Sequence, residues 1–271
     1  MLFSTPTLAI TFPMIDPVIV EVGSIAIRWY ALSYIIGILL GWWFIGKFDN
    51  KMPKVFSKRA YDDFIIWAVI GIMIGGRAGY VLFYNLDFYL EYPIEILAIW
   101  KGGMSFHGGL IGSAISMLIM CKLYKIKFLP TIDLVAAIAP IGIFFGRIAN
   151  FINAELYGRI TNQPWGIIFP GEAFARHPSQ IYEAILEGVV LFLIMLYFIY
   201  KKDMRKRAGT LTGIFLIGYS IFRGFIEIFR EPDTQLGFIF LEVTMGQILS
   251  IPMFLLGLYL ILRGKKKSAS A

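Results

Sequence analysis

The chain has 271 residues, of which 58% are hydrophobic and only 16% are charged. A soluble domain has roughly 45–50% apolar and about 25% charged residues, so this composition excludes an ordinary water-soluble protein and indicates one solvated by lipid. The single cysteine, Cys121, excludes an internal disulfide framework and a cysteine-based metal cluster.

The first 27 residues contain no Lys or Arg, and Pro6, Pro13 and Pro17 interrupt them. A cleavable signal peptide begins with positive charge and continues into an apolar core. We therefore expect the first membrane-spanning segment to direct the protein to the membrane by itself.

Seven segments are apolar and close to the length of about 20 residues that a helix needs to cross a bilayer. They cover residues 29–46, 64–84, 105–124, 132–153, 180–200, 211–229 and 242–262. In three of them small residues recur four positions apart, as at Gly71/Gly75/Gly79 and Gly108/Gly112/Ser116, which lets helices approach closely in lipid. The prediction is an all-α polytopic membrane protein with one transmembrane domain over residues 1–271. Residues 155–178 are expected to form a small extracytoplasmic head between the fourth and fifth spans.

Basic residues gather on alternate connections between these segments. Loops 47–59, 122–127 and 201–207 and the tail 263–267 carry 17 of the 25 Lys and Arg. Cytoplasmic loops hold such an excess, so we expect the N-terminus outside and the C-terminus inside. This distribution accounts for the net charge of +7 without a nucleic-acid partner. The remaining cations are all Arg except Lys101, and Arg suits bidentate contact with phosphate.

Polar residues gather at the end of the fourth span. Arg147 and Asn150 are about 60° apart on a helix, and Glu155 lies about 80° away on the other side if the helix continues. A charge inside the bilayer costs about 2.5–3.5 kcal/mol, so these residues and Asn153 indicate a site near the outer surface. The alternative is an arginine that only extends to the interface, which leaves both asparagines unexplained.

The sixth span carries a polar stripe on an otherwise apolar helix. Tyr219, Glu227 and Arg230 lie within about 40° of Arg223 around the helix axis. An Arg–Glu pair at i, i+4 could merely neutralise itself, which explains Glu227 but not Arg230. We interpret the stripe as a site in which Glu227 orients an arginine towards an anion.

A histidine lies at the outer start of the third span. Glycines flank His107 on both sides and allow a substrate to approach the ring, and imidazole accepts and returns protons near neutral pH. His177 is interpreted as a structural residue near a helix start. Ser179, with Glu183 nearby, is interpreted as helix-entry chemistry, and Cys121 as packing near the cytoplasmic end of the third span.

Two further residues could reach a lipid headgroup. Tyr30 follows Arg28 and Trp29 at the start of the first span, where Trp29 itself is typical of an interfacial anchor. Arg77 lies in a glycine-rich stretch of the second span, where the backbone can be approached closely.

The familiar motifs of metal, nucleotide and serine-hydrolase sites are missing from the sequence. We therefore expect neither a metal nor a cofactor. A site that stabilises phosphate with arginines fits the residues that remain.

The stretch from Gly146 to Gly158 resembles the signature of prolipoprotein diacylglyceryl transferases. Gly102–Gly109, Arg176–Glu183 and Tyr219–Arg230 are similar to further segments of that family, and the likeness runs in order from Arg28 to about Gln247. The resemblance implies a seven-span enzyme of the bacterial inner membrane with its active site toward the periplasm. It implies transfer of the diacylglyceryl group of phosphatidylglycerol to the lipobox cysteine of a prolipoprotein signal peptide. This is the first step of lipoprotein maturation, and it releases glycerol 1-phosphate.

With this chemistry the substrate supplies the nucleophilic thiolate, and the enzyme stabilises the leaving phosphate. The expected catalytic residues are His107 as general base, Arg147 and Arg223 at the phosphate, and Glu155 and Glu227 as supports of the arginines. The expected substrate-binding residues are Tyr30, Arg77, Asn150, Asn153, Gly158, Tyr219 and Arg230. The expected partners are phosphatidylglycerol and prolipoproteins, without a nucleic acid.

Three other functions fit part of the pattern. A transporter or channel would spread polar residues across the membrane depth, whereas here they gather in the outer half. A scaffold would use buried ion pairs only to fix helix register, which leaves His107 among its glycines unexplained. Another transferase acting on phospholipid headgroups would differ in its product.

Overall fold

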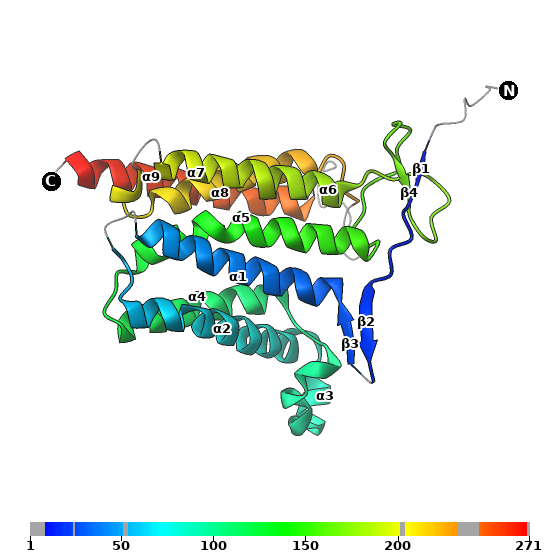
Figure 1. Cartoon of the computed structure of the whole chain (residues 1–271), viewed down its shortest axis with the longest axis horizontal. Coiled ribbons are helices and arrows are strands. Elements are labelled where there is room, and N and C mark those ends of the chain that lie inside the picture. Colours follow the sequence, from blue (N-terminus) through cyan, green and yellow to red (C-terminus); the bar gives the residue numbers. More distant parts are fainter. Residues whose placement is uncertain (1–8, 24, 51–53, 201–203, 232–243, 270–271) are drawn as a thin grey trace. The chain divides into compact units, whose positions relative to one another are not determined.

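The computed structural model describes residues 9–23, 25–50, 54–200, 204–231 and 244–269 (Figure 1). The chain divides into two compact units. The first unit comprises Met1–Phe48 and Ile132–Ala271, and the second comprises Asp49–Thr131.

Helices occupy all seven apolar segments expected from the sequence. They are α1 (Trp29–Asp49), α2 (Lys58–Tyr84), α4 (Phe106–Leu123), α5 (Phe128–Ile152), α6 continuing into α7 (Ser179–Tyr200), α8 (Thr210–Ile226) and α9 (Met245–Ala269). Five of these are long and apolar enough to cross a membrane, and α4 and α8 hold shorter apolar helices. This architecture agrees with the mostly helical polytopic membrane protein that the composition predicts. Residues 242–243 of the seventh segment lie outside the described residues, as do Lys51, Lys201 and Lys202 of the basic connections.

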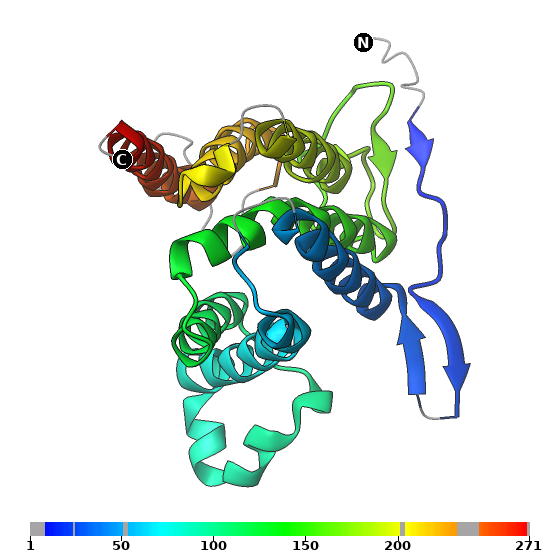
Figure 2. The same cartoon turned by 60° about the vertical axis from the view of Figure 1, so that its left-hand side comes forward.

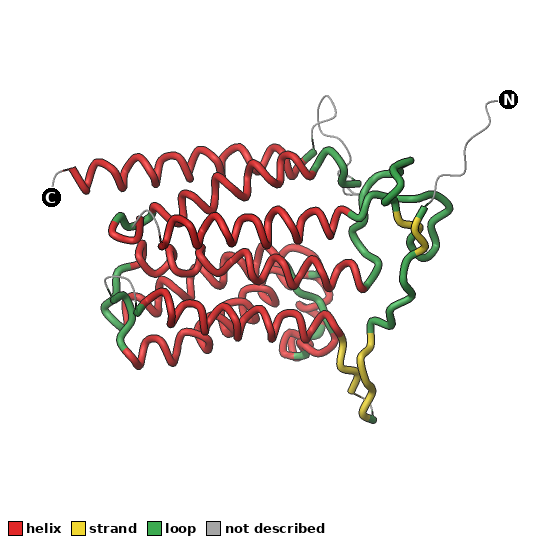
Figure 3. The backbone as a smooth tube through the Cα atoms, turned by 45° about the horizontal axis from the view of Figure 1, so that its top comes forward, coloured by secondary structure: helices red, strands yellow, loops and turns green. Residues whose placement is uncertain are grey.

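Among the described residues, four short strands accompany the helices (Figure 3). The apolar pattern of the sequence did not predict them. β1 (Ile10–Thr11) pairs in parallel with β4 (Ile167–Ile168). β2 (Val18–Val22) pairs antiparallel with β3 (Ile25–Arg28), which leads directly into α1. Val and Ile dominate β2 and β3, and β-branched residues favour strands.

Close helix contacts bring α1 and the helical segment before α7 towards α5 in the first unit (Figure 1). A Cβ added at Gly37 would lie 3.5 Å from the Gly142 Cα of α5, and one at Gly188 would meet Phe144 of α5 at 2.8 Å. Gly188 belongs to a π-helical stretch, Ala184–Val190, between α6 (Ser179–Glu183) and α7 (Leu191–Tyr200). Such small residues let helices pack tightly in lipid.

A buried carboxylate of α5 fixes the start of α8. Asp133 is fully buried and accepts hydrogen bonds from the backbone N–H groups of Gly209 (2.6 Å) and Thr212 (2.7 Å). It also accepts one from the Thr212 hydroxyl at 2.7 Å. These bonds satisfy N–H groups that a helix start leaves without partners, so Asp133 holds α8 against α5 at one end.

The segment after α5 folds into a small head, in which β4 pairs with β1 from the N-terminal part of the chain. Phe12, Ile167 and Phe169 form its buried core, and Tyr157 stacks on Phe169 with ring centroids 4.8 Å apart. Glu172 accepts hydrogen bonds from the Tyr157 hydroxyl (2.6 Å) and Arg176 Nε (2.9 Å). These two bonds lower the pKa of Glu172, so it is a carboxylate at neutral pH.

In the second unit α2 and α4 lie side by side (Figure 2). Their contact is made by Gly71, Gly75, Gly79, Gly108 and Gly112, as the small-residue spacing predicted. A Cβ at Gly75 would meet the Gly108 carbonyl oxygen at 2.3 Å, so the two backbones touch directly. A short helix, α3 (Leu86–Glu91), and two 3₁₀ turns, η1 (Pro93–Leu97) and η2 (Ile99–Lys101), connect α2 to α4.

Candidate active site

The residues expected to form the site fall in both units. Arg77 and His107 belong to the second unit. The other ten expected residues belong to the first unit, and most of them gather around a buried set of ionised groups where α5, α6 and α8 meet.

The centre of this set is Glu183, whose side chain is only 1% exposed. Its Oε2 forms an ion pair with Arg147 Nε and lies 3.5 Å from Arg223 Nη1. Its Oε1 accepts a hydrogen bond of 2.8 Å from Arg230 Nη1. Three guanidinium groups from separate parts of the chain therefore meet on one carboxylate.

Glu227 supports the same arginines from the end of α8. Its Oε1 lies 2.5 Å from Arg223 Nη2 and 4.0 Å from Arg230 Nε, and its Oε2 accepts a hydrogen bond of 2.8 Å from the Thr244 hydroxyl. A Cβ at Gly246 would lie 2.3 Å from Glu227 Oε1, so a glycine is needed for this approach. The structure thus brings Glu227 to Arg223 as the sequence predicted.

Three members of the set have polar atoms without a hydrogen-bond partner among the described residues. They are Glu183, whose Oε2 has only ion-pair contacts, Arg223 at Nη1, and the fully buried Glu187 at both carboxyl oxygens. Glu187 lies within the electrostatic influence of Glu183 and of Arg147, Arg223 and Arg230. We call these six residues the buried polar cluster: Arg147, Glu183, Glu187, Arg223, Glu227 and Arg230.

The arginines of the cluster are more accessible than its carboxylates. The side chains of Arg147, Arg223 and Arg230 are 21%, 14% and 11% exposed, whereas those of Glu183 and Glu227 are 1% and 4% exposed. An incoming group therefore meets positive charge first. This arrangement can bind an anion in apolar surroundings, where electrostatic attraction is strong.

A chain of hydrogen bonds leads from the cluster to the head. Arg147 Nη1 donates to Asn150 Oδ1 at 3.4 Å, and Asn150 Nδ2 donates to Glu155 Oε1 at 2.6 Å. Glu155 was predicted to hold Arg147 directly, but the carboxylate paired with Arg147 is Glu183. Glu155 is exposed and acts on Arg147 through Asn150. The reason is that α5 ends at Ile152, so Glu155 does not continue the helical face of Arg147.

Other expected residues lie at the edges of this arrangement. Tyr30 lies within the electrostatic influence of Arg147 and Glu155, and its hydroxyl is 3.2 Å from that of Tyr34. Tyr219 on α8 interacts electrostatically with Glu187 and Arg223. These positions agree with groups that could contact a ligand held by the cluster.

Asn153 and Gly158 belong to the connection between α5 and the head. The Asn153 N–H donates to the Ala149 carbonyl at 2.9 Å, just beyond the end of α5. The Gly158 N–H donates to the His177 carbonyl at 2.8 Å, and a Cβ at Gly158 would lie 2.3 Å from the Phe229 carbonyl oxygen. Close backbone packing explains the glycine at position 158 without a ligand.

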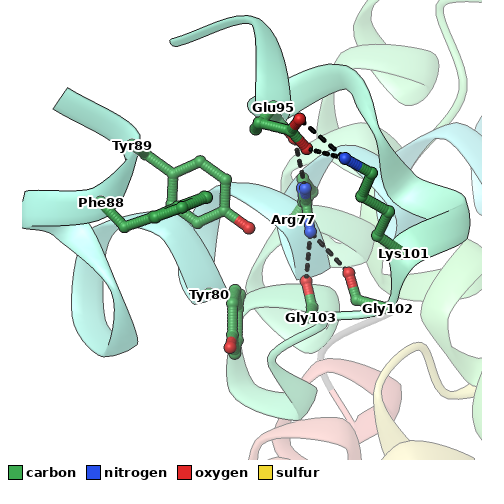
Figure 4. A pocket seen from close by; sticks show the side chains of 8 residues that line it. All are labelled: Arg77, Tyr80, Phe88, Tyr89, Glu95, Lys101, Gly102 and Gly103. Atoms are coloured by element: carbon green, nitrogen blue, oxygen red, sulfur yellow. Dashed lines mark hydrogen bonds and ion pairs between the residues drawn. The ribbon is translucent and has the colours of Figure 1, made fainter. Parts of the chain in front are cut away.

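Arg77 is bound by its own chain rather than left open to a substrate (Figure 4). Its five N–H groups point at the backbone carbonyls of Glu95, Ile96, Ala98, Gly102 and Gly103, at distances of 2.5–3.3 Å. The guanidinium lies beside a small cavity of about 240 Å³ that Tyr80, Phe88 and Tyr89 help to line. With every donor used, Arg77 holds the connection between α2 and α4, which differs from the lipid contact expected from the sequence.

His107 lies in the first turn of α4 with its side chain exposed. Ser105 caps this helix by accepting a hydrogen bond of 3.2 Å from the Gly108 N–H. The second histidine, His177, has its Nδ1 3.1 Å from the Tyr182 hydroxyl, and burial lowers its pKa, so it is neutral at neutral pH. Cys121 is buried beside Thr131, which agrees with packing.

The roles of Ser179, Glu183 and Glu187 were not predicted from the sequence. Ser179 does not cap α6, because its hydroxyl donates to the Leu156 carbonyl at 3.0 Å. Glu183 was expected at a helix entry, and it is instead the centre of the cluster. Two carboxylates four residues apart inside an apolar span were the available signal, because intramembrane charges are costly unless they are paired or functional.

Comparison with known proteins identifies the family. Residues 17–263 match the family model described as prolipoprotein diacylglyceryl transferase. The chain belongs to the prolipoprotein diacylglyceryl transferase family. The resemblance seen in the motifs is thereby confirmed, and the chain is a transferase of the membrane.

Similar proteins of this family occur in Rickettsia species. One from Rickettsia bellii (strain OSU 85-389), named phosphatidylglycerol–prolipoprotein diacylglyceryl transferase, is 53% identical over 259 residues, which cover 95% of this chain and 98% of the relative. Proteins of the same name from Rickettsia felis (strain ATCC VR-1525 / URRWXCal2) and Rickettsia rickettsii (strain Sheila Smith) are 54% identical over 258 residues. These alignments cover 95% of this chain and 100% of each relative.

Proposed function

We propose that this transferase moves the diacylglyceryl group of phosphatidylglycerol to the thiol of the lipobox cysteine in prolipoproteins and releases glycerol 1-phosphate. This would be the first step of lipoprotein maturation. Membership of the family and the names of the relatives support the reaction class. The buried polar cluster supports the chemistry.

The reaction requires stabilisation of the phosphate that leaves. A thiolate of the prolipoprotein attacks the glyceryl carbon, a C–S bond forms, and the C–O bond to phosphate breaks. Negative charge then grows on the phosphate oxygens. Guanidinium groups that are held in place before the reaction stabilise such charge without having to reorganise.

The observation that carries the proposal is Nη1 of Arg223, which is buried, makes no hydrogen bond within the described residues, and has only an ion-pair contact of 3.5 Å with Glu183. A buried donor without a partner is costly, and a phosphate oxygen would satisfy it. Glu183 and Glu227 hold the guanidinium groups in place. The three arginine side chains keep 11–21% of their surface exposed, which is where the phosphate would approach them.

Other residues expected from the sequence would bind the substrates or position the catalytic groups. Asn150, Tyr30 and Tyr219 would contact the glycerol headgroup, with Asn153, Gly158 and Arg230 shaping the rim of the site. Glu155 would orient Asn150, with which it is hydrogen bonded. His107 would act as the general base for the thiol, because its ring is exposed at the start of α4.

We further propose seven spans in the bacterial inner membrane, with the N-terminus outside, the C-terminus inside and the head of residues 155–178 toward the periplasm. The basic connections support this orientation, since Lys and Arg concentrate on cytoplasmic loops. α4 and α8 would provide the two spans that are shorter than the rest.

The test is incubation of the purified full chain with phosphatidylglycerol vesicles and a lipobox peptide. A mass gain of one diacylglyceryl unit on the peptide cysteine is the expected product, and a peptide with serine in place of cysteine should remain unchanged. Arg147→Lys and Arg223→Lys should each lower kcat/KM about 10²-fold or more, because Lys keeps the charge but loses the planar set of donors.

Arg176→Lys is the matched control, because Arg176 lies in the head, where it pairs with Glu172, and its other partner is the exposed Glu231 outside the cluster. We expect it to stay within about tenfold of the wild type. Near-normal transfer by the Arg147 and Arg223 variants would contradict the phosphate site. Transport of solute in sealed vesicles without peptide modification would favour a transporter instead.

A further inference from the structure

Glu187 is a buried carboxyl group to which the proposed reaction gives no role. It lies in the π-helical stretch Ala184–Val190, is fully buried, and has no hydrogen-bond partner for either oxygen within the described part of the chain. A carboxylate in such surroundings is disfavoured unless nearby cations compensate it. π-Helical stretches inside α-helices often lie at functional sites.

Charged groups on its own helix, on α5 and on and after α8 interact electrostatically with Glu187. Glu183 lies on its own helix, Arg147 on α5, and Arg223 on α8, together with the neutral Tyr219, while Arg230 follows α8. With Glu227 included, the buried polar cluster holds three positive and three negative charges when every member is ionised. Without an anion the cluster is therefore neutral only if Glu187 carries its charge.

A bound phosphodiester changes this balance by one negative charge. The phosphate would pair with the same guanidinium groups that compensate the charge of Glu187. The site would then carry a net negative charge, which is strongly disfavoured in apolar surroundings. Protonation of Glu187 restores neutrality. The other carboxylates are poorly placed to take that proton, because Glu183 and Glu227 each form ion pairs with the arginines.

We propose that Glu187 takes up one proton when an anionic phospholipid binds the arginines of the cluster, so that charge neutrality is kept. The proton comes from water, an O–H bond forms on Glu187, and no bond of the lipid changes in this step. The identity of the anion as phosphatidylglycerol rests on the proposed function. The proton linkage itself rests on the geometry and charge of the cluster.

Calorimetric titration of the full chain in detergent with short-chain phosphatidylglycerol measures this linkage. Repeating the titration in buffers of different ionisation enthalpy gives the number of protons taken up per lipid bound. The wild type should take up about one proton at neutral pH. Glu187→Gln, which is neutral and nearly the same shape, should take up none and bind at least as tightly. Glu231→Gln removes an exposed carboxylate outside the cluster and should keep the wild-type uptake.

The pH dependence of binding provides a second readout that needs only the wild type. Because binding consumes a proton, the wild-type Kd should rise with pH, by up to about tenfold per pH unit. The Kd of Glu187→Gln should stay flat over the same range. Glu187→Asp retains a carboxyl group and should retain the proton uptake.

Equal proton uptake by the wild type and Glu187→Gln would overturn the inference, as would a wild-type Kd that does not change with pH. If the wild type binds phosphatidylglycerol and modifies the lipobox peptide without a Glu187-dependent proton, only this inference fails. If it binds no phosphatidylglycerol, the inference and the proposed function both fail.

Discussion

Glu183 joins guanidinium groups that come from α5, from α8 and from the segment after α8. Each of these arginines is largely buried, so each depends on a carboxylate for compensation of its charge. Removal of one partner from a buried ion pair costs about 3–5 kcal/mol, because the remaining charge stays buried without compensation. Glu183 should therefore matter for stability as well as for the geometry of the site.

Glu183→Gln preserves the shape of the side chain and removes its charge. We expect it to lower the free energy of unfolding by about 3 kcal/mol or more, measured by thermal unfolding of the purified protein in detergent. Glu95→Gln is the control, since Glu95 pairs with the exposed Lys101 and such pairs contribute about 0–1 kcal/mol. Equal stability of the two variants would show that Glu183 does not compensate the arginines.

For single residues, the sequence predicts contacts within one helix better than contacts between two helices. Helical spacing placed Arg223, Glu227 and Arg230 on one face, and the structure brings them together. It could not pair Arg147 with Glu183, because that contact depends on how α5 packs against α6. The polar character of Glu183 and Glu187 was visible in the fifth span, but their partners were not.

The contact between α2 and α4 depends on positions that have no room for a side chain. A Cβ at Gly112 would lie 2.3 Å from the Gly71 carbonyl oxygen and 2.5 Å from the Gly75 Cα. Both are backbone atoms, so the helices would have to separate to accept even a methyl group. Gly109, three residues earlier on α4, has its nearest neighbour at 3.6 Å.

This difference gives a matched pair of substitutions on one helix. Gly112→Ala should destabilise the protein by about 1–3 kcal/mol through overpacking. Gly109→Ala should be neutral or stabilise by up to about 1 kcal/mol, because Ala is the better helix former. Unfolding temperatures in the same detergent would compare them, and a Gly112→Ala variant as stable as Gly109→Ala would contradict the close contact.

The strands were harder to predict than the helices. β2 and β3 carry a local signal of Val and Ile on both sides of Gly23, which has a positive φ of 64°. β1 and β4 have two residues each and lie more than 150 residues apart in the chain. Their pairing follows from the packing of Phe12 against Phe169, which no local pattern reveals.

For the whole molecule, the membrane location and the number of apolar helices were predicted from composition, and the orientation from the distribution of charge. The apolar segments are long, so their positions can be read from the sequence, and each is a helix in the structure. The direction in which the chain enters the membrane is an independent inference from the basic connections. It predicts that Lys54 and the exposed Gln163 of the head lie on opposite sides.

Labelling of single cysteines tests this orientation. Cys121→Ser provides a cysteine-free background, into which Lys54→Cys or Gln163→Cys is introduced. A membrane-impermeant maleimide should label Gln163→Cys in intact spheroplasts and Lys54→Cys only after lysis. The reverse pattern would show that the protein is inserted the other way round.

Five backbone carbonyl oxygens surround the guanidinium of Arg77 and bind it as ligands bind a cation. Without the guanidinium, five carbonyl dipoles of residues 95–103 would face one another in a largely buried space, and such groups are costly without donors. The cation thus acts as the template on which this connection folds. The connection ends two residues before Ser105, which caps the helix of His107, so Arg77 links the folding of this connection to the helix that carries the proposed base.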